Sequence, residues 1–277
     1  MQYFTDSPHK ISDETRLTFS ELAYSKFKFG ASDIGRKFGA ELYPVMESFL
    51  QQNQSKWDKI IVYSSPYDYI PTATYTMAFR FFEMLRKSPN LSGKTILWQK
   101  IKRTTTYTID YGNLNAEERL QLIGKDSFEL EHVPPPDALL IFIDDIKITG
   151  SHEYVIKRMI EKYRLPNDAC FLYYAILDNK CICPTFENRL NYAYINSPQR
   201  VRELLCRSDF QFNTRVVKYI LASPKADFRE ILSGMDEYQK GAFCQLAEGN
   251  GYSGIKAYAD NFQMLVEGID VGEKGML

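Results

Sequence analysis

Residues 138–152 read Ala-Leu-Leu-Ile-Phe-Ile-Asp-Asp-Ile-Lys-Ile-Thr-Gly-Ser-His, and this stretch decides the fold class. Its first six residues are continuously apolar, which predicts a strand buried on both faces. The carboxylates of Asp144 and Asp145 follow at the predicted end of that strand. A Thr-Gly-Ser segment then leads into a predicted amphipathic helix over residues 152–163, and the first N–H groups of a helix can bind an anion. Paired carboxylates beside such a loop suit ribose hydroxyls or a hydrated Mg2+, so the segment favours a sugar-phosphate site.

Strands and helices alternate on both sides of this segment. Apolar runs predict further strands over residues 59–63, 95–98 and 170–177. Helical periodicity predicts helices over residues 32–49 and 72–87. This alternation indicates an α/β fold with a parallel sheet and helices on both of its faces. Because ligands bind at the carboxyl ends of parallel strands, we expect the site in the loops after Tyr63, Trp98 and Ile143.

From about Phe186 the sequence pattern becomes helical. Apolar spacing predicts helices over residues 198–206, 213–222 and 252–266. We therefore expect two parts: a core over residues 1–185 with an N-terminal helical segment, and a helical C-terminal extension over residues 186–277. Residues 1–50 and the extension are both candidates for a hood over the site, with Tyr and Phe side chains that can stack on a base.

The composition is that of a globular protein with balanced charge. The 277 residues include 34 basic and 35 acidic side chains, and the net charge of −1 argues against a nucleic-acid partner. Five cysteines, with only Cys181-x-Cys183 close together, and three histidines argue against a closed zinc site. No signal peptide is evident, and the longest apolar run, residues 138–143, is far shorter than the ~20 residues that cross a bilayer. We expect a reduced, cytoplasmic protein with no membrane partner.

Residues 140–152 resemble the signature of the type I phosphoribosyltransferases. In that family a hydrophobic strand, two acidic residues and a Thr-Gly loop bind phosphoribosyl diphosphate. The resemblance implies a parallel-sheet type I phosphoribosyltransferase core, and it assigns Asp144 and Asp145 to the ribose hydroxyls. The same two residues would meet the cofactor Mg2+ through water or through those hydroxyls. The 5-phosphate loop then consists of Lys147, Ile148, Thr149, Gly150, Ser151 and His152.

The loop after the predicted strand 59–63 matches the family's pyrophosphate loop. The matching residues are Ser65, Pro66, Tyr67, Asp68 and Tyr69. Some family members carry a cation and a Gly where this chain has Asp68 and Tyr69, which weakens direct binding of the diphosphate here. Asp68 could hold a metal-bound water instead. The alternative is that this segment is only a Pro-bounded turn between a strand and a helix.

Basic residues after Trp98 are similar to those of the family's mobile loop, which folds over the diphosphate. These residues are Lys100, Lys102, Arg103 and Arg119. Their combination with Leu114, Glu118 and Phe128 is similar to the competence-protein branch of the family, and residues 24–30 are similar to an N-terminal segment of that branch. Asp110-Tyr111-Gly112 and the helical tail also resemble phosphoribosyltransferases predicted in bacterial tellurite-type stress operons. A solvated connector remains the alternative for this segment.

The resemblance implies a Mg2+-dependent transfer of the phosphoribosyl group from phosphoribosyl diphosphate to an acceptor, with release of diphosphate. The acceptor would be nucleobase-like or another small molecule, and a homodimer is one expectation for the assembly. Ile148 departs from the family because several purine-salvage members have an acidic residue there that serves the base. His152 replaces the final Thr of the phosphate loop. The alternative function is that of a non-catalytic protein that senses a nucleotide or phosphoribosyl diphosphate.

Overall fold

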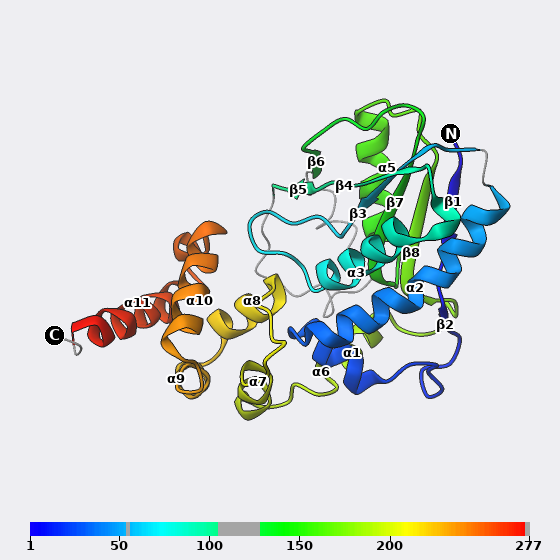
Figure 1. The fold of residues 1–277 in the computed structure, drawn as a ribbon. Coiled ribbons are helices and arrows are strands. Elements are labelled where there is room, and N and C mark those ends of the chain that lie inside the picture. The colour runs from blue at the N-terminus through cyan, green and yellow to red at the C-terminus, as the bar shows by residue number, and fades with distance from the viewer. Residues whose placement is uncertain (54–55, 105–127, 275–277) are drawn as a thin grey trace.

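The structure is a computed structural model that describes residues 1–53, 56–104 and 128–274, with side chains as far as residue 268. Its centre is a parallel sheet with the strand order β1-β8-β7-β3-β4, and β2 continues the β1 edge along β8 (Figure 1). The strands are β1 (Tyr3–Asp6), β2 (His9–Ile11), β3 (Lys59–Tyr63), β4 (Thr95–Trp98), β7 (Ala138–Lys147) and β8 (Ala169–Leu177). β1 and β2 were not expected, because strands of 4 and 3 residues are too short to show a pattern.

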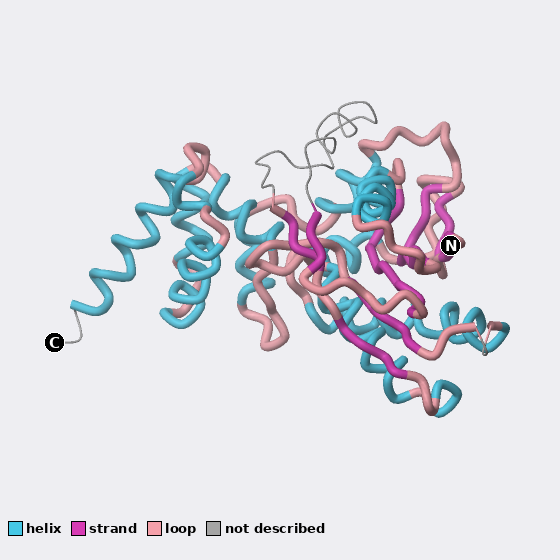
Figure 2. Tube along the Cα trace, turned by 90° about the horizontal axis from the view of Figure 1, so that it is seen from above, coloured by secondary structure: helices cyan, strands magenta, loops and turns pink. Residues whose placement is uncertain are grey.

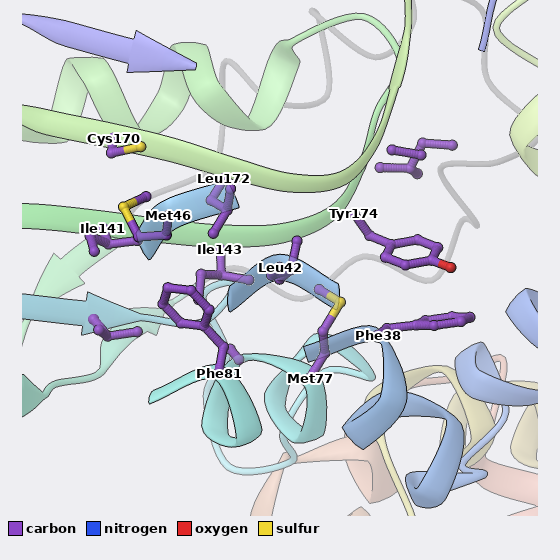
Figure 3. Close-up of a cluster of buried hydrophobic side chains, with 14 of the residues drawn as sticks. Phe38, Leu42, Met46, Met77, Phe81, Ile141, Ile143, Cys170, Leu172 and Tyr174 are labelled. Atoms are coloured by element: carbon purple, nitrogen blue, oxygen red, sulfur yellow. The ribbon is translucent and has the colours of Figure 1, made fainter. Parts of the chain in front are cut away.

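Side chains of the central strands alternate between two apolar layers. One layer packs against α2 (Ser32–Gln52) and α3 (Thr74–Lys87), as Figure 3 shows. Its strand residues include Ile60, Val62, Leu139, Ile141, Ile143, Cys170 and Leu172. The opposite layer packs against α5 (Ser151–Lys162), and its strand residues include Ile61, Tyr63, Leu140, Phe142, Phe171 and Tyr173. Burial on both faces explains the continuous apolar runs and confirms the predicted α/β fold with helices on both faces of a parallel sheet.

Strand β7 is longer than the sequence predicts. Its ladder with β8 continues past Ile143, pairs Asp144 with Tyr173, and ends at Lys147. The expected strand end at Ile143 is therefore wrong, because β8 runs on beside β7 and keeps the backbone groups of β7 paired. Asp144 and Asp145 consequently lie inside the sheet and not in the loop that follows it.

A second, antiparallel sheet lies beside the loop that follows β3. It pairs β5 (Ile101–Arg103) with β6 (Phe128–Leu130). Tyr67 joins this small sheet through a parallel bridge to Lys102. The structure therefore describes the start of the expected mobile loop, with Lys100, Lys102 and Arg103. Leu114, Glu118 and Arg119 lie outside the described residues.

The chain beyond β8 is helical, as the sequence predicts. Its helices are α6 (Phe186–Tyr192), α7 (Pro198–Leu205), α8 (Thr214–Ala222), α9 (Lys225–Leu232), α10 (Glu237–Gly249) and α11 (Ala259–Lys274). Figures 1 and 2 show the last of them projecting away from the sheet. The single helix expected over residues 252–266 is wrong: a short 3-10 turn, Tyr252–Gly254, precedes an extended residue, and α11 begins only at Ala259. Among the helices of the described ranges, none has the length and apolar character needed to cross a membrane.

The helical extension is attached to the N-terminal helices by backbone contacts. The N–H of Gln211 donates to the carbonyl of Gly30 at 2.9 Å, just after α1 (Glu21–Lys28). Gly30 has a φ of +97°, and a Cβ there would lie 2.5 Å from the carbonyl oxygen of Gln211. Only glycine both adopts this positive φ readily and lacks the Cβ that would clash with the carbonyl. Gly30 therefore allows the extension to approach α1 closely.

Candidate active site

A cavity of about 420 Å³ opens at the carboxyl end of the sheet. Its walls come from the β7–α5 segment, the loop after β3, and residues of α1, α6, α8 and α9. The sheet places Asp144 and Asp145 on one wall, and helix α8 forms part of the opposite side. This volume falls within the range of pockets that hold small ligands.

Asp144 is held by donors on both of its carboxylate oxygens. The hydroxyl of Ser65 donates to Oδ1 at 2.6 Å, and Nδ1 of His152 donates to Oδ2 at 3.0 Å. Burial acts to raise the pKa of Asp144, but His152, Ser65 and the charge of Lys28 outweigh it and lower the pKa to about 2. The carboxylate is therefore ionised at neutral pH and can accept hydrogen bonds from ligand hydroxyls.

Asp145 lies deeper in the fold, with 5% of its surface exposed. Its Oδ2 accepts hydrogen bonds from the hydroxyl of Tyr24, at 2.9 Å, and from the ammonium of Lys28. Burial raises the pKa of Asp145, and the neighbouring Asp144 adds to that rise, while Lys28 opposes it. The two adjacent carboxylates therefore differ in protonation behaviour, and α1 supplies the groups that hold the inner one.

The predicted 5-phosphate loop forms the turn between β7 and α5. Gly150 occupies the N-cap position of α5 with a φ of +76°, a conformation that L side chains rarely adopt. The hydroxyls of Thr149 and Ser151 share a hydrogen bond of 2.6 Å beside it. All six residues from Lys147 to His152 line the cavity. The first N–H groups of α5 and two hydroxyls thus meet at one point, which is the arrangement that binds a phosphate at a helix N-terminus.

Lys147 and His152 do not extend from this loop as isolated cations. The ammonium of Lys147 lies 2.6 Å from Glu153, which also pairs with Lys157 at 2.6 Å and accepts from the hydroxyl of Tyr173 at 3.1 Å. His152 faces Asp144 as described above. A ligand phosphate would therefore depend mainly on backbone N–H groups and hydroxyls.

The predicted pyrophosphate loop contributes little to the cavity wall. Of its five predicted residues, Ser65 lines the cavity, whereas Pro66, Tyr67, Asp68 and Tyr69 do not. The ammonium of Lys102 lies 3.5 Å from Asp68, and that of Lys100 lies 3.5 Å from Glu131 and 4.7 Å from the ring centre of Tyr67. Of the predicted mobile-loop cations in the described residues, Arg103 lines the cavity and Lys100 and Lys102 do not. Arg119 lies outside the described residues.

A family model described as PRTase ComF-like matches residues 4–265. The chain belongs to the ComF-like phosphoribosyltransferase family. This confirms the resemblance to the type I family and to its competence-protein branch, while the link to stress operons stays a prediction. No curated protein matches the chain.

Several cavity residues of this ComF-like chain were not found from the sequence. The residues on the wall outside the predicted motifs include Lys28, Glu187, Tyr192, Arg215, Lys218, Tyr219, Asp227 and Tyr258. In α8, five of the nine positions line the cavity: Thr214, Arg215, Lys218, Tyr219 and Ala222. Their spacing is that of one helical face, which was the only available signal, and it does not say what that face meets.

The donor set of this cavity fits a Mg2+ that arrives with its ligand. The described residues contain no group of three or more His, Cys, Asp or Glu side chains that could hold a metal ion. Mg2+ commonly binds through one or two carboxylates together with water and substrate phosphates. Asp144 and Asp145 can supply that share, through water or ribose hydroxyls, while they keep their present hydrogen bonds.

Proposed function

We propose that the protein is a Mg2+-dependent phosphoribosyltransferase. It binds phosphoribosyl diphosphate in the cavity, transfers the phosphoribosyl group to a nucleobase-like or other small acceptor, and releases diphosphate. One observation carries the proposal: Asp144, Asp145 and the loop from Lys147 to His152 line one cavity at the carboxyl end of a parallel sheet. The family match supports the class of reaction.

The turn between β7 and α5 would bind the 5-phosphate. Gly150 lets the backbone approach the phosphate, and the hydroxyls of Thr149 and Ser151 lie beside the first N–H groups of α5. Because neutral backbone groups supply most of these contacts, this half of the site should also bind a simple sugar phosphate.

The two carboxylates would hold and orient the ribose. Asp144 is ionised and can accept hydrogen bonds from ribose hydroxyls, while Ser65 and His152 fix its orientation. Transfer at the anomeric carbon develops positive charge on the ribosyl group, and preorganised carboxylates beside it stabilise that charge. When bound, Mg2+ supplies neutralisation of the diphosphate leaving group.

Calorimetric titration with phosphoribosyl diphosphate in the presence of Mg2+ tests this function. We expect saturable binding at one site, and a thermal shift that follows the same concentration dependence. The absence of both heat and thermal shift at millimolar ligand would contradict the proposal.

A sensor that binds the same ligand without turnover is the second candidate. It is favoured by Ile148, which lines the cavity at a position where several purine-salvage members carry an acidic residue, and which cannot transfer a proton. Measuring diphosphate release over a broad panel of bases and other acceptors separates the two candidates. An enzyme releases diphosphate with some acceptor, whereas a sensor binds phosphoribosyl diphosphate and never turns it over.

A further inference from the structure

Two N–H groups of the predicted pyrophosphate loop, and that of the residue after it, are hydrogen-bonded within the protein. The N–H of Tyr67 donates to the carbonyl of Ile101 at 3.2 Å. The N–H groups of Tyr69 and Ile70 both donate to Oδ1 of Asn250, at 3.1 and 2.9 Å. A loop that binds a diphosphate needs such N–H groups to point at the ligand. These three N–H groups are therefore already used within the protein, which favours other donors for a diphosphate in this cavity.

Two cations from distant parts of the chain line the cavity and interact with one buried phenol, Tyr252. Arg103, at the end of β5, and Lys218, in the middle of α8, both line the cavity. The ammonium of Lys218 lies 5.8 Å from the ring centre of Tyr252. Burial raises the pKa of Tyr252, and the charge of Arg103 opposes that rise.

A buried hydroxyl belongs to the residue that packs against Tyr252. Tyr258 is 1% exposed, lines the cavity, and packs edge-on against Tyr252 with ring centres 5.5 Å apart. Within the described residues its hydroxyl has no hydrogen-bond partner. A buried hydroxyl without a partner is costly, and an acceptor oxygen from a ligand would remove that cost.

We propose that Arg103, Lys218 and Tyr258 form an anion subsite that binds the diphosphate of the phosphoribosyl ligand. The inference rests on the proposed function. In this arrangement α8 and the segment before α11 help to bind the diphosphate, which was the expected role of the pyrophosphate loop. Two cations and one neutral donor match the charge and the acceptor oxygens of a diphosphate.

The remaining charged residues of the cavity act at other places. The charge of Arg215 acts on Tyr24, which donates to Asp145. The charge of Asp227 acts on Tyr219. The acidic side chain whose charge reaches Tyr252 is Asp68, which is itself close to Lys102.

Two ligands and two substitutions test the subsite. Phosphoribosyl diphosphate with Mg2+ carries the diphosphate, and ribose 5-phosphate lacks it. Tyr258→Phe removes only the hydroxyl, and Lys218→Met removes the charge but keeps a long side chain. For each variant we expect affinity for phosphoribosyl diphosphate to fall about tenfold, since a hydrogen bond to a charged group is lost. Affinity for ribose 5-phosphate should change by less than about threefold, because its contacts lie elsewhere.

Matched controls separate this effect from general damage. Tyr63→Phe removes a buried hydroxyl of β3 that donates to Gln99 and belongs to a residue that does not line the cavity. Lys240→Met removes a cation of α10 that pairs with Glu237 outside the cavity. Both controls should bind the two ligands like the wild type. Circular dichroism and thermal unfolding establish that each variant is folded.

The outcomes distinguish this inference from the proposed function. Wild-type affinity for phosphoribosyl diphosphate in both test variants overturns the subsite and leaves the function standing. Equal losses for both ligands also overturn it, because the residues would then not act on the diphosphate. A wild-type protein that binds neither ligand contradicts the proposed function, and the subsite falls with it. Should Lys218→Met fail to fold, the isosteric Tyr258→Phe decides alone.

Discussion

The hydroxyl of Tyr24 donates a 2.9 Å hydrogen bond to Oδ2 of Asp145 and so joins α1 to the interior of the sheet. Burial raises the pKa of Tyr24 well above its usual range, and the charge of Asp145 acts in the same direction. The phenol therefore stays protonated and serves as a donor. Lys28, one helical turn further along α1, approaches the same oxygen. Helix α1 thus supplies the two side-chain donors to Oδ2 of the inner carboxylate of the site.

Replacing Tyr24 with Phe should lower the free energy of unfolding by about 1–3 kcal/mol, because a buried carboxylate loses one of its donors. Urea unfolding followed by circular dichroism measures this change. Tyr252→Phe is the matched control: its hydroxyl is also buried but has no partner within the described residues, so its loss should cost nothing measurable. Equal stability of Tyr24→Phe and wild type would show that the hydrogen bond contributes nothing.

Replacing Asp144 and Asp145 together with Asn should greatly weaken the binding of phosphoribosyl diphosphate. Asn keeps the shape of the side chain but loses charge-assisted hydrogen bonds, each typically worth ~1.5–3 kcal/mol. Two such losses predict an affinity drop on the order of a hundredfold or more, measured by calorimetry. Inorganic phosphate should bind the variant nearly as well as the wild type, because the start of α5 holds it.

The exposed Asp137, which pairs with Lys59 at 3.1 Å, provides the control for that experiment. Asp137→Asn removes one carboxylate charge away from the cavity and should leave binding unchanged. A folded double variant that binds phosphoribosyl diphosphate like the wild type would remove the two carboxylates from the ribose site.

The Asp144 carboxyl should make stability depend on pH in acid. Its pKa in the folded protein is about 2, whereas an unfolded Asp has an ordinary value of about 3.9. The unfolded chain therefore binds this proton more readily than the folded protein. The stabilisation from the carboxylate is complete above about pH 4 and is lost as the pH falls toward 2, a change of about 2 kcal/mol.

Unfolding of the wild type and Asp144→Asn, compared between about pH 5 and pH 2.5, isolates this contribution, because other titrating groups are shared. The stability difference between the two proteins should move in favour of the variant as the pH falls. A difference that does not change with pH would mean that the carboxyl has the same pKa in the folded and unfolded states.

Gly30→Ala should destabilise the contact between α1 and the helical extension. The added Cβ would lie 2.5 Å from the Gln211 carbonyl oxygen, and alanine is strained at a φ of +97°. We expect a loss of more than about 1 kcal/mol in unfolding free energy. Gly241→Ala, inside α10 with no atom within 4 Å of the new Cβ, should instead stabilise the protein by about 0.5–1 kcal/mol. Equal effects of the two substitutions would contradict this account.

Local patterns in the sequence were enough to predict much of the fold and part of the candidate site. The apolar run before Asp144 is visible because a strand buried on both faces has no polar alternation. The adjacent carboxylates suggested a strand end, since charged side chains are unusual within a buried β-ladder. The pairing with β8 shows instead that β7 continues through both residues. The loop near Gly150 could be predicted because all of its groups are close in sequence.

Contacts between distant segments could not be read in this way. Asn250 accepts from the N–H of Ile70 across 180 residues, and no periodicity links the two positions. Lys218 and Tyr258 likewise belong to different helical segments and meet at the cavity only after folding. The sequence shows that α8 has a polar face, but the partner of that face depends on how the extension packs.

The position of Asp144 and Asp145 inside the β7–β8 ladder has a consequence for the thermodynamics of binding. Carboxylates on a loop would lose backbone conformational entropy when a ligand arrives, at about 1–2 kcal/mol for each residue that becomes ordered. In this protein the sheet has already restricted those two residues during folding. On the proposed function, ribose hydroxyls would meet acceptors whose backbone is preorganised, and ordering of the strand would not offset the favourable enthalpy of these hydrogen bonds.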